Sequence, residues 1–513
     1  MERHLSAFLT PTIAGKIGFT ENIPKDRDPV VTGIEYDSRK VRPGNLYCAL
    51  TGLHTDGHHF IDAALSHGAS VIVHQHAIPV HDGIVSIKVQ DSRFALSPVS
   101  ASFYDFPSQS MTLIGVTGTE GKSTTVSLVH QLLCAAGKTA GFISTVQHGD
   151  GTTIVENPEH QTTPEASTIQ RMLAVMRDNC CEYVVLEASS HGLSPRTNRL
   201  GDVAFDVGIM TNVAHEHLEF HGTWEQYRHD KANLFRSLDN CNHQKRMNPA
   251  ESFGVLNADD KSAGYFADAT GKPVYRFSVQ GKPADIRLLN LESGMTGNRY
   301  TVSCSGSDKY LSFEDHLPGA FNAGNVLAAL LTVSKSTGIG IHDLVPFVQR
   351  LKPVCGRMTR IDHGQPFEVI VDYAHTPSSF AALFPALRKR ITGNIISVFG
   401  SPGDRDTQKR PEQGKIAARF SDYILLTDED PRGESSMDIL QDIAAGCPDA
   451  NLLFIPDRPS AIRKAFSMAK VDDLVLLLGK GHENTIIYND YVMPFNEIAE
   501  AKKALSEMGF PEH

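Results

Sequence analysis

Residues 112–125 read TLIGVTGTEGKSTT, and this stretch decides the expected fold of the chain. An apolar run suited to a buried strand precedes a glycine-rich turn, and residues 124–137 continue with the apolar spacing of a helix. Such a turn presents backbone N–H groups to an anion, and the helix N-terminus adds its positive end. We therefore predict a phosphate-binding loop in which Lys122 contacts the β- and γ-phosphates and Ser123 or Thr124 holds Mg²⁺.

The loop departs from the general pattern G-x-x-x-x-G-K-[ST] at its first glycine. Val116 occupies that position, and Gly115 lies one residue early. The strand before the loop and the helix after it disfavour the alternative of a glycine-rich turn with a surface lysine. Glu120 is unexpected beside a triphosphate because the two negative charges repel, so we expect its side chain to point away or to form a salt bridge.

Length and composition indicate a globular protein of several domains. At about 150 residues per domain, 513 residues predict three, and we place them at 1–105, 106–352 and 353–513. The net charge of −11 disfavours a nucleic-acid partner. The eight cysteines are spread out without a C-x-x-C pair, which is typical of reduced thiols. The chain has neither a secretion signal nor an apolar run of about 18 residues, so we expect a cytoplasmic protein without membrane contact. We also expect it to be a monomer.

Strand-like and helical segments alternate along the chain, which predicts α/β units with parallel sheets. The N-terminal unit has strand candidates at 69–75 and 83–89 and a helix at 60–69. Residues 273–316 alternate like antiparallel strands and form an expected insert at one sheet edge. Further strands are expected in the central unit at 182–189, 206–212 and 252–258, and in the C-terminal unit at 368–374, 394–401, 422–430, 450–457 and 473–481.

Several motifs, in order along the chain, carry a resemblance to a known family. The loop G-V-T-G-T-x-G-K-S-T resembles that of Mur ligases and folylpolyglutamate synthetases, which carry Asn in place of Glu120. The other motifs resemble the UDP-N-acetylmuramoyl-tripeptide synthetases, the Mur ligases that add the third amino acid. These motifs are DSRKVRPGNLYCAL (37–50), LEASSHGL (186–193), TNVAHEHLEFHGT (211–223), YRHDKANLF (227–235), LPGAFNAGN (317–325), CGRMTRI (355–361), VDYAHTP (371–377), GDRDTQKRP (403–411), DEDPR (428–432) and GKGHE (479–483).

The resemblance implies a three-domain α/β architecture. Its N-terminal domain would bind UDP, its central P-loop domain ATP, and its C-terminal Rossmann-like domain an amino acid. It also implies an ATP-dependent amide ligase of peptidoglycan synthesis that acts on UDP-MurNAc-L-Ala-D-Glu through an acyl phosphate. The residues it assigns to ATP are Gly118, Thr119, Glu120, Gly121, Lys122, Ser123, Thr124, Asn322, Asn325, Arg357 and Asp372. Those it assigns to the nucleotide-sugar dipeptide are Ser38, Thr162, Thr163, Ser189 and Arg199, with Arg196 as a competitor because SPRTNRL is about two residues longer than usual.

The resemblance further implies that Lys122, Glu187, His217 and Lys231 are catalytic, and that Ser123, Glu187, His217 and a carbamylated Lys231 surround Mg²⁺. A carboxylate such as Glu187 at the end of a strand suits Mg²⁺. A partly buried lysine can lose its proton and react as an amine, and carbamylation turns it into an oxygen ligand. The alternative for Lys231 is a solvated surface lysine. A zinc site at His215, His217 and His221 is disfavoured because no cysteine or second histidine cluster is nearby in sequence.

The expected third amino acid is a diamino acid whose identity stays open. The resemblance assigns its binding to Arg405, Asp430, Arg432, Gly479 and Glu483. Relatives that use meso-diaminopimelate carry D-N-P-R where this chain has Asp430 in place of Asn. An ionised aspartate cannot donate a hydrogen bond to a distal carboxylate, which favours lysine or ornithine. Arg432 favours a distal carboxylate unless Asp430 pairs with it.

Three other functions remain as alternatives. A folylpolyglutamate synthetase would share the phosphate loop but lack DSRKVRPGN, TTPE and DEDPR. A P-loop switch would hydrolyse ATP without an amine acceptor. A catalytically silent amino-acid-binding protein is disfavoured because Lys122, Glu187, His217 and Lys231 are all present.

Overall fold

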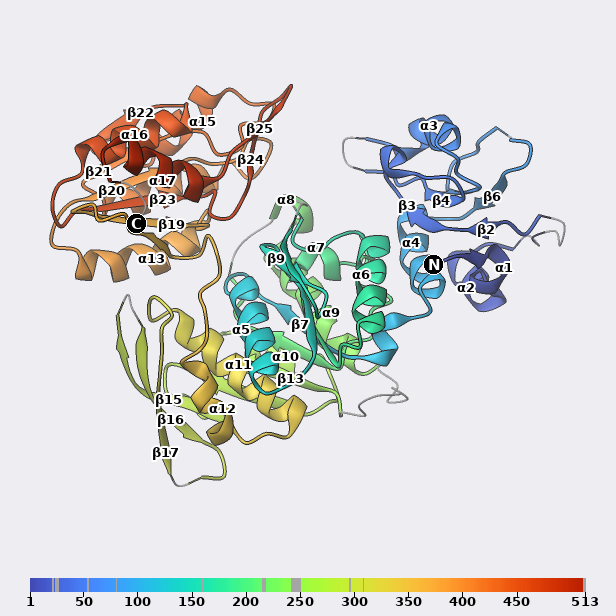
Figure 1. Cartoon of the computed structure of the whole chain (residues 1–513), viewed down its shortest axis with the longest axis horizontal. Coiled ribbons are helices and arrows are strands. Elements are labelled where there is room, and N and C mark those ends of the chain that lie inside the picture. The colour runs from blue at the N-terminus through green and yellow to red at the C-terminus, as the bar shows by residue number, and fades with distance from the viewer. Residues whose placement is uncertain are drawn as a thin grey trace.

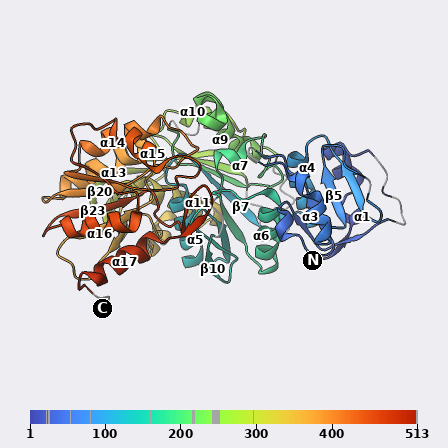
Figure 2. The same cartoon turned by 90° about the horizontal axis from the view of Figure 1, so that it is seen from above.

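The computed structural model places one sheet-based unit at each end of the chain and a larger unit between them (Figures 1 and 2). It describes all residues except 21, 22, 24–26, 53, 54, 80, 158–160, 215–217, 241–250, 295, 296, 308 and 511–513. Within these described residues, no helix combines the length and the apolar character that crossing a bilayer requires.

The N-terminal unit is built on a four-stranded parallel sheet in the order β3-β4-β5-β6. The strands expected at 69–75 and 83–89 are confirmed as β5 and β6, and the expected helix begins at Ile61. A two-stranded antiparallel pair, β1–β2, lies beside this sheet. The elements are β1 (Arg3–His4), α1 (Leu5–Phe8), α2 (Pro11–Ile17), β2 (Val30–Val31), β3 (Gly33–Glu35), β4 (Asn45–Cys48), α3 (Ile61–Ser66), β5 (Val71–His74), β6 (Val85–Lys88) and α4 (Ser92–Phe103).

The central unit contains an eleven-stranded sheet in the order β10-β9-β8-β11-β7-β12-β13-β14-β15-β16-β17. Pairing is parallel from β8 through β15 and antiparallel at both edges. The strands are β7 (Thr112–Thr117), β8 (Ala140–Ile143), β9 (Gln147–Gly149), β10 (Ile154–Glu156), β11 (Tyr183–Glu187), β12 (Val207–Met210), β13 (Phe253–Asn257), β14 (Val274–Ser278), β15 (Ile286–Ser293), β16 (Asn298–Cys304) and β17 (Tyr310–Asp315). The strands expected at 182–189, 206–212 and 252–258 are confirmed.

The expectation of an antiparallel insert at 273–316 is wrong for its first strand. β14 pairs in parallel with β13, because helix α10 (Ala263–Ala267) lies between them in sequence and returns the chain in the same direction. Only β15, β16 and β17 form the antiparallel edge that the alternation predicted.

Helices cover both faces of the central sheet. Along β7, Ile114 and Val116 belong to the apolar cluster shared with α5 and α11, whereas Leu113 belongs to the cluster shared with α6 and α9. This alternation is what a parallel strand between two helical layers requires. The helices are α5 (Lys122–Ala135), α6 (Ala166–Asp178), α7 (Ser190–Leu193), α8 (Leu218–His221), α9 (Trp224–Leu238), α11 (Asn322–Thr337) and α12 (Ile341–Val348).

The C-terminal unit has a six-stranded sheet in the order β18-β19-β23-β20-β21-β22, parallel except for β18. All five expected strands are confirmed, whereas β18 and the hairpin β24–β25 were not expected. The elements are β18 (Thr359–Ile361), β19 (Glu368–Asp372), α13 (Pro377–Arg390), β20 (Ile395–Phe399), α14 (Lys409–Ala418), β21 (Tyr423–Leu426), α15 (Ser436–Ala444), β22 (Leu452–Phe454), α16 (Arg458–Met468), β23 (Leu474–Leu478), β24 (Thr485–Ile487), β25 (Val492–Pro494) and α17 (Glu497–Glu507).

The two outer units are attached to the central unit in different ways. Ala166 and Ala174 of α6 belong to the buried apolar cluster of the N-terminal unit, so these two units share a core. The C-terminal clusters contain only residues from 358 onward, and no buried apolar cluster of the described residues joins them to the central unit. Polar contacts join those two units, among them Thr376 with Glu120 and Asn484 with Glu156.

Candidate active site

A cavity of about 1000 Å³ lies where the three units meet. The N-terminal unit contributes Gln75 and Arg93 among others, and the central unit contributes the phosphate loop and the end of β11. The C-terminal unit contributes residues that follow β19, β20, β21 and β23. These are the carboxyl ends of parallel strands, where ligands bind in open α/β sheets.

The expected phosphate loop connects β7 to α5, and α5 begins at Lys122. Gly121 precedes the helix at φ +82°, and a Cβ there would come 2.5 Å from Oδ1 of Asn325. A Cβ on Gly118 would come 1.9 Å from Oγ1 of Thr211. Neither position has room for a side chain, so both must be glycine. The loop can therefore present its backbone N–H groups to an anion at the start of α5.

Lys122 and Thr119 line the cavity, and the Lys122 ammonium donates a hydrogen bond of 2.8 Å to the Thr119 carbonyl. Ser123 is buried directly behind the loop, and Thr124 is half-buried. The lysine lies over its own loop, where a bound phosphate oxygen can replace the carbonyl as its acceptor.

Glu120 also lines the cavity, but its side chain leads to the C-terminal unit. Its Oε1 accepts a hydrogen bond of 2.9 Å from the Thr376 hydroxyl, at the start of α13. The Glu120 side chain thus extends to the C-terminal unit, where a hydroxyl group binds the carboxylate that would otherwise repel a triphosphate.

The expected catalytic residues Glu187 and Lys231 both line the cavity. Glu187 ends β11, is 2% exposed, and accepts a hydrogen bond of 2.9 Å from the Thr145 N–H through Oε2. Lys231 of α9 is 1% exposed and donates a bond of 2.6 Å to the Gly118 carbonyl, and its ammonium lies 4.5 Å from the Tyr227 ring centre. The solvated surface lysine considered from the sequence is therefore wrong.

The expected metal-associated His217 lies outside the described residues, as does His215. The third histidine of the zinc alternative, His221, is buried, and its Nδ1 lies 2.9 Å from Oδ2 of Asp230. This pair places His221 in the packing of α8 against α9.

Four of the five residues expected to bind the nucleotide-sugar dipeptide line the cavity, namely Thr162, Thr163, Ser189 and Arg199. The Thr163 hydroxyl lies 2.9 Å from the Ser189 hydroxyl, whose oxygen caps α7. The competitor Arg196 lines the cavity too, so both arginines stay candidates. Ser38 does not line the cavity and lies in a 3₁₀ turn of the N-terminal unit.

Arg93 and Glu165 were missed in the sequence analysis. Glu165 accepts hydrogen bonds from Arg93 of the N-terminal unit at 3.1 Å and from Arg199 at 2.8 Å. Its second oxygen is buried without a hydrogen-bond partner. A single carboxylate thus holds two guanidinium groups at the cavity wall. The motif TTPE contains Glu165 and could have signalled it, but nothing local signals Arg93, which is 72 residues away.

Asn322 and Asn325 lie in the first turn of α11, beside the phosphate loop. The Asn325 amide donates to the Asn322 side-chain oxygen at 3.1 Å, and its own oxygen accepts from the Thr125 hydroxyl at 3.1 Å. Both side chains are buried. Their expected contact with adenine stays a prediction.

Arg357 and Asp372 lie in the C-terminal unit. Arg357 lines the cavity, and its guanidinium carbon lies 4.7 Å from the Tyr373 ring centre. Asp372 ends β19 and accepts hydrogen bonds of 2.7 Å from the N–H groups of Met358 and Ala374. Burial raises the pKa of the Asp372 carboxyl, although the Arg357 charge opposes this. Asp372 therefore fixes the loop that carries Arg357.

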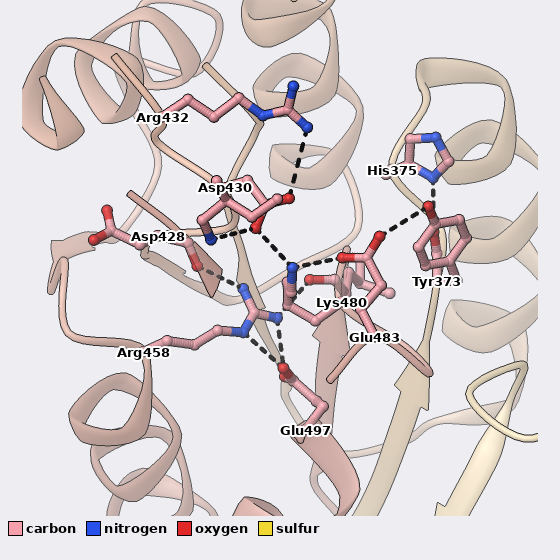
Figure 3. A network of polar contacts seen from close by, with 11 residues as sticks. Tyr373, His375, Asp428, Asp430, Arg432, Arg458, Lys480, Glu483 and Glu497 are labelled. Carbon is pink, nitrogen blue, oxygen red and sulfur yellow. Dashed lines mark hydrogen bonds and ion pairs between the residues drawn. The ribbon is translucent and has the colours of Figure 1, made fainter. Parts of the chain in front are cut away.

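The five residues expected to bind the amino acid lie at the carboxyl edge of the C-terminal sheet, and Figure 3 shows the polar network around three of them. The Lys480 ammonium, missed in the sequence analysis although GKGHE contains it, lies 2.9 Å from Oδ1 of Asp430 and 2.5 Å from Oε2 of Glu483. Arg432 lies 3.9 Å from the other Asp430 oxygen. Asp430 is thus compensated by two cations.

The remaining two expected residues differ in their exposure to the cavity. Arg405 lines it from the loop after β20. Gly479 follows β23 at φ +101°, and a Cβ there would come 2.8 Å from Oε2 of Glu429. Gly479 therefore leaves room for Glu429, a further residue that the sequence analysis missed.

Glu429 lines the cavity, is 7% exposed, and has a buried Oε2 without a hydrogen-bond partner. Burial raises the pKa of this carboxyl to about 7, since the nearby Lys409 and Lys480 compensate only in part. A half-ionised carboxyl in a cleft is a candidate ligand for an ammonium group. The motif DEDPR contains Glu429 as well as the expected Asp430.

A buried ion pair holds the two loops of this pocket together. Arg458 and Glu497 are both fully buried and lie 2.7 Å apart (Figure 3). The Arg458 guanidinium also donates to the carbonyls of Asp428 at 3.1 Å and Leu478 at 2.7 Å. These carbonyls lie where β21 and β23 end, so Arg458 positions the loops that carry Asp430 and Lys480.

Comparison with known proteins finds family models over much of the chain. The Mur ligase family catalytic domain matches residues 30–104, the Mur ligase middle domain matches 116–333, and the Mur ligase glutamate ligase domain matches 356–481. Among solved structures, a UDP-N-acetylmuramoyl-L-alanyl-D-glutamate–2,6-diaminopimelate ligase superposes with a TM-score of 0.62 at 27% identity, covering 97% of this chain and 99% of that one.

Curated relatives are more similar in sequence. A UDP-N-acetylmuramyl-tripeptide synthetase of Treponema denticola is 49% identical, with 93% of this chain and 94% of that protein covered. Its counterpart in Treponema pallidum is 48% identical, with 93% of each chain covered. A UDP-N-acetylmuramoyl-L-alanyl-D-glutamate–2,6-diaminopimelate ligase of Geobacillus thermodenitrificans is 37% identical, covering 94% of this chain and 96% of that one. The chain belongs to the Mur ligase family, among the UDP-N-acetylmuramyl-tripeptide synthetases.

Proposed function

We propose that the chain is an ATP-dependent amide ligase that adds a diamino acid to UDP-MurNAc-L-Ala-D-Glu. One observation carries this proposal: the phosphate loop, the Thr162–Thr163 pair and the charged pocket of the C-terminal unit all line one cavity. ATP, the nucleotide-sugar dipeptide and the amino acid would each contact a different group of cavity residues. The names of the relatives support the same substrate.

In the first step of the reaction two anions, the substrate carboxylate and ATP, react with each other, and the amine of the amino acid reacts in the second step. The D-Glu carboxylate attacks the γ-phosphorus of ATP, and ADP leaves as the acyl phosphate forms. The amine of the incoming amino acid then attacks the acyl carbon, loses a proton, and displaces phosphate. Lys122 and the loop N–H groups offset the negative charge that gathers in the first step. Arg199 or Arg196 orients the substrate carboxylate, because a guanidinium matches it geometrically.

The residues near the loop fit Mg²⁺ by the chemistry of their donors. Ser123 and Glu187 offer oxygen, which this ion prefers, and the buried Lys231 would offer oxygen once carbamylated. When bound, the ion would neutralise charge on the phosphates. Lys231 itself donates to the Gly118 carbonyl, so a carbamate at this position would lie against the loop.

The pocket supports a diamino acid with a distal ammonium group. Arg432 lies 3.9 Å from Asp430, so the arginine that would favour a distal carboxylate is already partly compensated. Glu429 provides a further carboxylate facing the cavity, whereas the carboxylate of Glu483 is paired with the Lys480 ammonium. Lysine and ornithine therefore fit the charges better than diaminopimelate does.

We also propose the setting in which the enzyme works. Within the described residues, the seven cysteines are free thiols, which supports the cytoplasm. Described residues of all three units of one chain line the cavity, which is compatible with a monomer. Residues 105 and 352 both lie between the last strand of one of the three main sheets and the first strand of the next. This position supports the domain bounds 1–105, 106–352 and 353–513.

The test is a reconstituted reaction with one amino acid at a time. The protein is incubated with ATP, Mg²⁺ and UDP-MurNAc-L-Ala-D-Glu plus lysine, ornithine or meso-diaminopimelate, and the nucleotide product is weighed by mass spectrometry. We expect a mass gain of one diamino-acid residue. ATP hydrolysis without any nucleotide product would favour a P-loop switch. Glutamate addition in a parallel reaction that contains a folate and glutamate would favour a folylpolyglutamate synthetase.

A further inference from the structure

Glu120 is held rigidly in the phosphate loop by its backbone. Its N–H donates to Oδ1 of Asn212 at 2.9 Å. Its carbonyl accepts from the Thr211 hydroxyl at 2.7 Å and from the Asn212 amide at 3.0 Å. Because both peptide groups are fixed to the loop that follows β12, the direction of the Glu120 side chain is set by the central unit.

One partner of that side chain is Thr376, the residue that caps α13. The Thr376 hydroxyl oxygen accepts the Ser379 N–H at 3.1 Å, which satisfies the first turn of the helix. An ionised carboxylate only accepts, so the hydroxyl hydrogen of Thr376 is the one directed at Glu120. One hydroxyl therefore caps the helix and binds the other unit.

The position at the helix N-terminus favours a negative charge. Helix α13 runs for 14 residues from Pro377, and the partial positive charge at its start lies next to Thr376. The start of α13 is also tied to α14, since the carbonyl of His375 accepts from the Lys409 ammonium at 3.2 Å and the Gln413 amide at 2.9 Å. A contact at Thr376 thus positions Lys409, which lines the cavity.

This contact lies between units that share no buried apolar cluster within the described residues. Interfaces of this polar kind permit relative motion of domains. A second side-chain hydrogen bond between these units, from Asn484 to Glu156 at 2.9 Å, is exposed. Thr376, in contrast, is 3% exposed, so its bond to Glu120 is better shielded from water.

We propose that Glu120 and Thr376 form a latch between the phosphate loop and the C-terminal unit, which holds the cavity closed. Glu120 is then a positioning residue, in place of the nucleotide contact expected from the sequence. The latch places the amino-acid pocket over the loop where the acyl phosphate forms. In this respect the inference rests on the proposed function.

The test uses variants on both sides of the latch. Glu120→Ala removes the acceptor. Thr376→Asp keeps the helix cap, because aspartate is a good capping residue, but sets two carboxylates against each other. We expect both variants to increase the nucleotide-free radius of gyration in small-angle X-ray scattering and to raise KM for the accepted diamino acid about tenfold. Affinity for ADP, measured by calorimetry, should be unchanged or tighter.

Three controls make the result specific. Combining Glu120→Ala with Thr376→Asp should cause no more than the larger single effect, since both remove one contact. Glu120→Gln with Thr376→Asp should restore a compact particle, because the amide can donate to the new carboxylate. Asn484→Ala, which removes the exposed contact between the same units, should scatter like the wild type.

Several outcomes would overturn the latch. These are an unchanged radius of gyration in both single variants, additive effects on KM, or a loss of ADP affinity as large as the change in KM. Scattering and ADP binding need no turnover. If the wild-type protein has ligase activity but the radius of gyration of the variants is unchanged, only the latch is refuted. If the wild-type protein lacks ligase activity, only the proposed function is refuted.

Discussion

Glu429→Gln should stabilise the C-terminal unit at alkaline pH while weakening amino-acid binding. The wild-type carboxyl is buried, its Oε2 lacks a hydrogen-bond partner, and its pKa rises from 4.5 to about 7 because of this burial. Glutamine has nearly the same shape and cannot ionise. The substitution therefore removes the cost of a buried charge and leaves the packing in place.

The sign and the size follow from proton linkage. Between pH 4.5 and 7 the unfolded chain releases a proton that the folded protein keeps, so the free energy of unfolding falls as pH rises. A difference of about 2.5 units corresponds to about 3 kcal/mol, reached above pH 7. At pH 4 both states are protonated and the cost disappears. The Gln variant should therefore gain about 3 kcal/mol over the wild type at pH 8 and almost nothing at pH 4.

The assay is urea unfolding at the two pH values, followed by hydrogen exchange in β21 and β23 so that the C-terminal unit is observed separately. Glu434→Gln is the matched control with the opposite sign. The Arg410 hydrogen bond lowers the pKa of Glu434, so neutralising it should destabilise the unit at pH 8. A stability difference between Glu429→Gln and wild type that is the same at both pH values would refute the reasoning.

Three other substitutions and one control substitution test the site. Lys122→Ala should lower kcat by about 10²- to 10³-fold in the ligase assay, and wild-type kcat would contradict its role in charge neutralisation. Lys231→Ala should lose about 10- to 100-fold in activity and recover part of it with added short carboxylic acids; full activity without them would exclude a carbamate. Arg458→Lys should cost the C-terminal unit about 3 kcal/mol in urea and raise the amino-acid KM, whereas Arg463→Lys, which pairs in a half-exposed position, should cost under about 1 kcal/mol. Equal losses in the last two would contradict the positioning role of Arg458.

The strands and the phosphate loop could be predicted because their signals are local. The apolar run before the loop, the glycines at 118 and 121, and the helix that follows all lie within about 25 residues. The parallel pairing of β14 could not be predicted in this way. It depends on the direction in which α10 returns the chain, and alternation within a strand is the same for parallel edges and antiparallel ones.

The charged pocket shows a second limit of sequence reasoning. Asp430 and Lys480 are 50 residues apart and follow β21 and β23, two strands that are not neighbours because β20 lies between them. Their sequence motifs identify both loops, but not the strand order that brings the loops together. The same holds for Glu120, whose departure from the family pattern is visible in sequence while its partner is 256 residues away.

The two kinds of attachment between units match the needs of the chemistry. An acyl phosphate must be shielded from water, yet three reactants must first enter the cavity. Opening the shared apolar core between the N-terminal and central units would expose buried side chains such as Ala166 and Ala174 to water. Opening the C-terminal contact costs mainly hydrogen bonds that water can replace, such as the one at Thr376. The unit that carries the proposed amino-acid pocket is therefore the one that can swing away, and the bond between Thr376 and Glu120 is one of the contacts that such a motion would break.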